Sequence, residues 1–224
     1  MVVAGAEARG PHDRVAALLD AIHAELELRA TEVSDGAPPL GSVYLGGGTP
    51  SLMSAAQVGA LLDAVDRRLG IADAAEVTLE ANPGEDDIGD LAGFRSAGVN
   101  RLSIGAQSMD DAELRRLGRR HRSADVVAAV ELARRVGFES VSLDLLTDIP
   151  GQSVSSWRGT LEAALVLAPD HLSAYTLTLD DPDAEGLTGP GGDHLPLTRG
   201  ARAWRERSLL EQSEERAAEM ELLT

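Results

Sequence analysis

The stretch VYLGGGTPS at Val43–Ser51 decides how the rest of this chain is interpreted. A short apolar segment with the character of a strand runs into three glycines, and Pro50 then ends the strand and begins a turn. Three successive residues without a Cβ allow a ligand to lie directly against the backbone and its N–H groups. A tight connection between a strand and a helix would use the same residues, so the stretch predicts either a structural turn or a binding loop.

The same order of strand and then helix recurs along the chain. We expect strands at Ser42–Leu45, Glu76–Glu80, Arg101–Gly105, Ser140–Leu145 and His171–Leu177. We expect helices at His12–Ala30, Ser54–Leu69, Asp86–Ala97, Ser123–Val136, Ser153–Leu167 and Arg199–Leu223. Regular alternation of this kind predicts an α/β fold with a parallel sheet covered by helices.

The strands distinguish two α/β architectures. In the segment 141–146, Val, Leu and Leu alternate with Ser, Asp and Leu. Polar residues that point inward near the ends of strands are typical of a (β/α) barrel with a site at its mouth. A doubly wound open sheet is the alternative, but its strands would be more continuously apolar. We therefore expect a partial (β/α) barrel of parallel strands with outer helices. Because a helix precedes the first predicted strand, we also expect an earlier strand to be missing.

The predicted organisation has four parts. Residues 1–11 form a disordered N-terminal segment, and residues 12–180 form the partial barrel. Residues 181–198 are rich in Gly, Pro and Asp and are expected to be a loop, while 199–224 form a C-terminal helix at the start of a following region. We interpret the chain as part of a larger protein or as one that needs a partner.

Composition excludes several classes of function. Acidic residues number 37 against 20 basic ones, so the net charge of −17 argues against a nucleic-acid partner. No apolar run approaches the roughly 20 residues that span a bilayer, and the start of the chain lacks the features of a signal peptide, so we expect a cytoplasmic protein. The chain has no cysteine, which excludes disulfides, thiolate metal sites and a cysteine nucleophile within it.

Polar residues gather at or just beyond the predicted strand ends. These are Gly47, Gly48, Thr49, Glu80, Gln107, Asp144 and Thr178, and Arg119 could reach the same space from a short helix begun by Asp110 or Asp111. Each could simply cap a helix or satisfy a buried backbone group. Together they suit a ligand that carries both an ammonium and a carboxylate group, because carboxylates attract the cation and Arg binds the anion.

At these residues the chain resembles a known family. VYLGGGTPS, TLEANPG, RLSIGAQS, RRLGRRH and LDLLTDIPGQ occur in order and are similar to motifs of the radical S-adenosylmethionine (SAM) family of oxygen-independent coproporphyrinogen III oxidases. HLSAYTLT and the PGQ ending resemble more closely its HemW branch of heme chaperones.

The resemblance implies a partial barrel that binds SAM at its mouth. Gly47, Gly48 and Thr49 would line the methionine end, with Glu80 near the ammonium group. In the oxidase branch the positions that match Gln107, Arg119, Asp144 and Thr178 contact a second SAM molecule. The resemblance also implies heme or another tetrapyrrole as a small-molecule partner, together with an electron donor and a heme-accepting protein that the sequence does not identify.

The chain departs from the family at its cofactor. The family holds a 4Fe–4S cluster with a CxxxCxxC motif after its first strand, and neither that strand nor the motif is present here. We therefore expect this polypeptide alone to generate no radical, and whether it is an enzyme stays open. The alternatives are a non-catalytic heme-binding or tetrapyrrole-binding protein and a cluster-free relative with another ligand.

The histidines offer little support for a metal or heme ligand. His12, His23, His121, His171 and His194 show no ligand spacing. We expect His121, which follows two arginines, to be solvated, and His171 to be structural.

Overall fold

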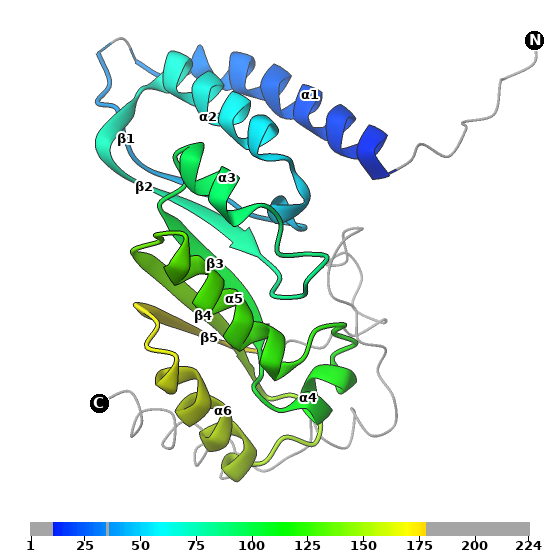
Figure 1. Ribbon diagram of the computed structural model, residues 1–224. Helices are drawn as coiled ribbons and strands as arrows, with labels where there is room; N and C mark the ends of the chain where they lie inside the picture. The colour runs from blue at the N-terminus through cyan, green and yellow to red at the C-terminus, as the bar shows by residue number, and fades with distance from the viewer. Residues whose placement is uncertain (1–10, 35, 178–224) are drawn as a thin grey trace, which may run out of the picture.

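The computed structural model describes residues 11–34 and 36–177. Five strands form one sheet in the order β1-β2-β3-β4-β5, and every neighbouring pair is parallel. Figure 1 shows the strands as a curved half-barrel with the helices on its outer side. The prediction of a partial (β/α) barrel is confirmed. The strands are β1 (Leu40–Leu45), β2 (Ile71–Ala81), β3 (Arg101–Gln107), β4 (Ser140–Thr147) and β5 (His171–Thr176).

The hydrophobic core lies between the sheet and the helices. Apolar residues of β2, β3 and β4 alternate toward this side, and they form one buried cluster with residues of four helices. These are α2 (Ala55–Leu69), α3 (Leu91–Ser96), α5 (Ser123–Arg135) and α6 (Val154–Val166). The other face of the sheet is therefore left for polar side chains.

The remaining helices lie outside this layer. α1 (Pro11–Ala30) runs along α2, and Arg68 of α2 donates to Glu27 of α1 at 2.8 Å. The short α4 (Asp111–Arg116) follows β3, and a 3-10 turn, η1 (Pro50–Leu52), follows the glycine stretch. Among the described residues no helix is both long and apolar enough to cross a membrane.

Local sequence signals explain several helix ends. Ser54 and Gln57 form a capping box at the start of α2. Gly70, Gly98 and Gly137 have φ values of 71°, 110° and 92°, as expected for residues that end helices.

The helix predicted at Asp86–Ala97 is wrong at its start, since α3 comprises only Leu91–Ser96. Gly89 adopts a φ of 74° directly before it, and a Cβ there would overlap the carbonyl of Ser51. Asp90 then accepts a hydrogen bond from Gly93 N at 2.9 Å and starts the helix. A left-handed residue and a new N-cap thus override the helical pattern before Leu91.

Strand β2 is longer than the predicted Glu76–Glu80 because it already begins at Ile71. Its pairing with β1 shifts register between Leu40 and Ser42, which pair with Ile71 and Glu76. The added segment is rich in alanine, a residue with little preference for strands, so the sequence carries no strand signal there. The predicted loop 181–198 and helix 199–224 lie outside the described residues.

Candidate functional site at the mouth of the half-barrel

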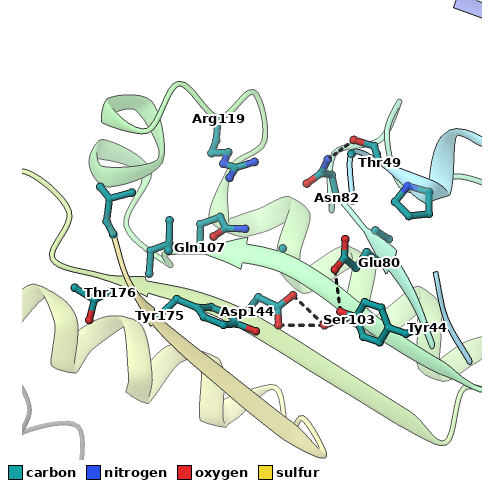
Figure 2. Close-up of a pocket in the computed structure, with 16 residues that line it drawn as sticks. Tyr44, Thr49, Glu80, Asn82, Ser103, Gln107, Arg119, Asp144, Tyr175 and Thr176 are labelled. Atoms are coloured by element: carbon teal, nitrogen blue, oxygen red, sulfur yellow. Dashed lines mark hydrogen bonds between the residues drawn. The ribbon is translucent and has the colours of Figure 1, made fainter. Parts of the chain in front are cut away.

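A cavity of about 700 Å³ lies on the concave face of the sheet, near the carboxyl ends of the strands. Figure 2 shows side chains from all five strands and the following loops turned toward it. Six of the eight predicted site residues line it: Gly48, Thr49, Glu80, Gln107, Arg119 and Asp144. Gly47 is adjacent and bonded to Glu80, and Thr178 lies outside the described residues, although its neighbours Thr176 and Leu177 line the cavity.

The alternation of the strands creates the floor of the cavity. Every strand contributes an inward side chain to a row along the floor: Tyr44, Glu80, Ser103, Asp144 and Tyr175. Glu80 pairs directly with Ser103 in the sheet, and the other neighbours in this row are offset from each other by two residues. Neighbouring parallel strands lie about 4.8 Å apart, so adjacent members of this row can contact one another.

The glycine stretch forms one wall. Gly47 and Gly48 have φ values of 81° and 68°, and a Cβ on either would meet no atom within 4 Å. A Cβ on Gly46, in contrast, would lie 2.6 Å from the ring of Tyr44 and 2.8 Å from Glu80 Oε1. The first glycine therefore makes room for the floor, while the next two keep the wall free of side chains, and Gly48 lines the cavity.

Glu80 joins the glycine wall to the floor. Its Oε2 accepts a hydrogen bond from Gly47 N at 3.0 Å, and its Oε1 accepts one from Tyr44 Oη at 2.9 Å. Burial of the phenol, together with the hydrogen bond to Glu80 and the charge of Glu80, raises the pKa of Tyr44 to about 12. Each carboxylate oxygen can accept more than one hydrogen bond, so Glu80 keeps acceptor capacity toward the cavity.

Asp144 is the second carboxylate of the floor. Ser103 Oγ lies 3.0 Å from its Oδ1 and 2.9 Å from its Oδ2. Burial raises the pKa of Asp144, and the charge of Glu80 acts in the same direction, while bonds from Ser103 and Ser173 oppose the shift. The floor is therefore an acidic surface whose charge is only partly compensated.

The rim supplies an amide and a guanidinium group. Gln107 ends β3, and Arg119 follows α4 with its backbone N bonded to the carbonyl of Leu114 at 2.9 Å. Figure 2 shows both side chains above the floor on the side opposite the glycine wall. Asn82 Nδ2 lies 3.3 Å from Thr49 Oγ1 and ties that wall to the end of β2.

His121 corrects the sequence prediction. We expected a solvated side chain, but only 7% of it is exposed, and Nε2 lies 3.2 Å from the carbonyl of Ala106. Burial lowers the pKa of His121, while the bond to Ala106 opposes the shift. The imidazole supports the end of β3 from behind the cavity and does not line it.

Comparisons with known proteins agree with this geometry. Residues 20–164 match the Radical SAM superfamily. The chain belongs to that superfamily.

Its relatives include heme chaperones. The chain is 44% identical over 139 residues to the heme chaperone HemW of Escherichia coli, a match that covers 62% of this chain and 37% of that protein. It is 48% identical over 139 residues to the mouse mitochondrial radical S-adenosyl methionine domain-containing protein 1, covering 62% of this chain and 31% of the relative. The solved coproporphyrinogen III oxidase HemN of E. coli, described as a radical SAM enzyme, superposes with a TM-score of 0.75 at 25% identity. That superposition covers 96% of this chain and 46% of HemN. This is therefore a HemW-like member of the radical SAM superfamily that spans less than half the length of these three proteins.

The residues present do not fit the iron–sulfur cluster that the radical SAM superfamily implies. Such clusters are held by cysteine thiolates, and this sequence has no cysteine. Among the residues that the structure describes, no group of three or more His, Asp or Glu side chains is arranged to hold a metal ion. The residues of the mouth do fit an organic ligand with an ammonium group, since Glu80 and Asp144 both face the cavity.

Sequence reasoning missed five polar residues of the mouth: Tyr44, Asn82, Ser103, Tyr175 and Thr176. Strand alternation was a usable signal for three of them, because Tyr44, Ser103 and Tyr175 occupy the same face as the predicted acids. Asn82 follows Glu80 by two residues and continues that face beyond the strand. The prediction was limited to one position or short stretch at or just beyond each strand end, so it left out the other inward side chains of the same strands.

Proposed function

We propose that the mouth of this half-barrel binds the amino-acid end of S-adenosylmethionine. The observation that carries the proposal is the position of Glu80, whose carboxylate is fixed by Gly47 and Tyr44 at the edge of an open cavity. A fixed carboxylate that retains acceptor capacity suits an ammonium group. The open backbone of Gly47 and Gly48, with Thr49, would then lie against the methionine chain.

The second half of the mouth offers a further set of contacts. Gln107, Arg119 and Asp144 face the cavity opposite the glycine wall, and Thr178 follows the last described residue of this rim. We assign these residues to a second SAM molecule or to the remainder of the first. Arg119 is suited to a carboxylate group, and Asp144 to a cationic group.

We propose that this chain binds SAM and carries out no redox step by itself. In the superfamily SAM supplies a radical when a reduced cluster donates an electron, and the residues present here do not fit that cluster. The chain's own contribution is to orient the ligand: Glu80 holds the ammonium group, and the glycine wall excludes side chains from the methionine.

The longer proteins that this chain resembles support a tetrapyrrole as the wider substrate class. Its relatives are named heme chaperones, and the solved relative is named a coproporphyrinogen III oxidase. We propose that the protein takes part in heme or porphyrin handling. Heme titration into the purified chain would test this, and a Soret band identical to that of free heme would contradict heme binding by this segment.

Isothermal titration calorimetry with SAM tests the main proposal. We expect weak binding to the wild type and a loss of affinity of about tenfold in Glu80→Gln, because the charge-assisted hydrogen bond to the ammonium group is removed. Glu76→Gln is the matched control, since Glu76 is on the same strand and face but four residues nearer its start. Equal affinities of wild type and Glu80→Gln would overturn the placement of the ligand.

A further inference from the structure

The end of β3 contains an unusual turn at a residue of the mouth. Gln107 has a φ of 66°, and Ser108 N donates to the carbonyl of Ala106 at 2.8 Å. A hydrogen bond across three residues with a positive central φ is a γ-turn of the rare, strained kind. The pairing of β3 with β4 also shifts register between Ile104 and Gln107. The backbone thus leaves regular strand geometry where it presents the Gln107 side chain to the cavity.

A buried polar cluster lies directly behind this turn. Ser108 Oγ donates to Glu113 Oε2 at 2.6 Å and lies 3.2 Å from Thr160 Oγ1. Gln152 Nε2 and Ser156 Oγ also donate to Glu113. Ser108, Glu113 and Thr160 are 0%, 1% and 2% exposed.

This cluster is costly to build, so its placement calls for a reason. A buried carboxylate is strongly destabilising unless donors compensate its charge. Glu113 receives three side-chain donors, from the β3–α4 loop, the β4–α6 loop and α6. An apolar side chain would fill this space without that desolvation cost. A carboxylate, however, can hold Ser108 in one orientation, and Ser108 N closes the turn at Gln107.

We propose that Ser108 and Glu113 form a positioning lock that holds Gln107 in its strained turn and so directs the Gln107 amide into the mouth. Strained backbone persists only where the surrounding structure over-determines it, and the donors and acceptors around Ser108 provide that restraint. The lock also fixes α4, whose following loop carries Arg119. Ser108 and Glu113 act through Gln107, so their functional role rests on the proposed binding site.

Paired substitutions at Gln107 test the lock without any ligand. Glycine adopts a positive φ without strain, whereas alanine does not. We expect the unfolding equilibrium constant of Gln107→Gly to be roughly fivefold smaller than that of Gln107→Ala when Glu113 is intact. In the Glu113→Gln background the turn can relax, and this advantage of glycine should disappear. A fivefold advantage that persists in Glu113→Gln, or none with Glu113 intact, would overturn the lock.

Hydrogen exchange provides a second measurement that does not need cooperative unfolding. We expect the Ser108 amide to exchange about tenfold faster in Glu113→Gln and in Ser108→Ala than in the wild type. Asp111→Asn is the matched control: Asp111 is on the same helix but accepts from Ser123 N at 2.9 Å and Ser123 Oγ at 3.0 Å. Unchanged exchange in Glu113→Gln, or an equal increase in Asp111→Asn, would contradict a specific lock.

SAM affinity connects the lock to the mouth and separates the two proposals. If Glu113 acts through Gln107, Glu113→Gln should weaken SAM binding when Gln107 is present. In a Gln107→Ala background the same substitution should raise the dissociation constant for SAM by less than twofold. Full additivity would contradict that route. A wild-type chain that binds no SAM would overturn the proposed function, while the exchange and stability measurements would still decide whether the lock exists.

Discussion

The two faces of the sheet are built from alternating residues of the same strands, yet they differ completely in chemistry. On the convex face Leu79, Ile104 and Leu143 are fully buried against helices. On the concave face Glu80 and Asp144 border an open cavity. Because strand side chains alternate with a period of two, adjacent residues can serve stability and binding separately. The convex face should therefore dominate folding energy, and the concave face should dominate ligand affinity.

The concave face also holds ionisable groups whose pKa values are raised. Burial and the charge of Glu80 disfavour ionised Asp144, and burial together with the hydrogen bond and charge of Glu80 disfavours ionised Tyr44. Such perturbed groups are typical of binding and catalytic sites, where the arrangement serves a ligand. On the convex face, in contrast, the strands pack against one large cluster of apolar side chains.

The largest effect should come from a cavity in the convex face. We expect Leu143→Ala to lower the free energy of unfolding by about 2–5 kcal/mol, because it removes a fully buried side chain. Leu146→Ala, on the same strand but lining the mouth, should cost about 1 kcal/mol or less. Urea denaturation of both variants measures the difference. Equal losses would show that the two faces do not divide stability and binding in this way.

Titration of Tyr44 tests the electrostatic coupling to Glu80 that distinguishes the concave face. The chain has two tyrosines, so a Tyr175→Phe background leaves Tyr44 as the only tyrosinate signal. There we expect a Tyr44 pKa of about 12, and Glu80→Gln should lower it toward 10.0, because the hydrogen bond to a charged acceptor and the repulsion both disappear. Burial of the phenol would retain part of the shift. A Tyr44 pKa unaffected by Glu80→Gln would show that the two side chains do not interact in solution.

Asp144 gives a pH-dependent contrast of smaller size. In the folded protein its pKa is raised above the ordinary 3.8. At pH values between 3.8 and the folded-state pKa, the folded state therefore binds more protons than the unfolded state. Stability should therefore decrease as the pH rises from 3.8 through the folded pKa, and then level off. Asp144→Asn should lack this decrease and be more stable than wild type near neutral pH, by less than the loss in Leu143→Ala. Stability curves of the two proteins that stay parallel down to pH 3.8 would contradict the raised pKa.

The sequence predicted those parts of the molecule that depend on short-range pattern. Alternation along β4 identified the barrel and placed Asp144 in its mouth, and the glycine stretch identified one wall. The shortened α3 was not predictable, because the need for a glycine at position 89 comes from the distant Ser51 carbonyl, which a Cβ there would overlap. His121 was misplaced for a related reason: its partner, Ala106, lies on a strand that the local charge pattern does not reveal.

The buried lock shows the same limit more clearly. Glu113 looks like an ordinary surface acid in a short helix of mostly charged residues. Its partners Gln152 and Ser156 are 39 and 43 residues away, so only the packing of α4 against α6 reveals their role. Binding residues whose positions follow from strand alternation can thus be found from sequence. Residues that position them through long-range packing cannot.

The smallest predicted effect tests whether the convex side can be stabilised without a change in the mouth. Ala168 occupies the position after the C-cap of α6 with a φ of 47°, where α5 has Gly137 with a φ of 92°. We expect Ala168→Gly to raise the free energy of unfolding by about 0.5–1 kcal/mol, because glycine removes the left-handed strain that alanine bears. Gly137→Ala is the reciprocal control and should destabilise the chain by a similar amount. Neither residue lines the cavity, so SAM affinity should be the same in both variants. A change in affinity would mean that the α6–β5 connection is coupled to the mouth, and the separation of the two faces would then have to be abandoned.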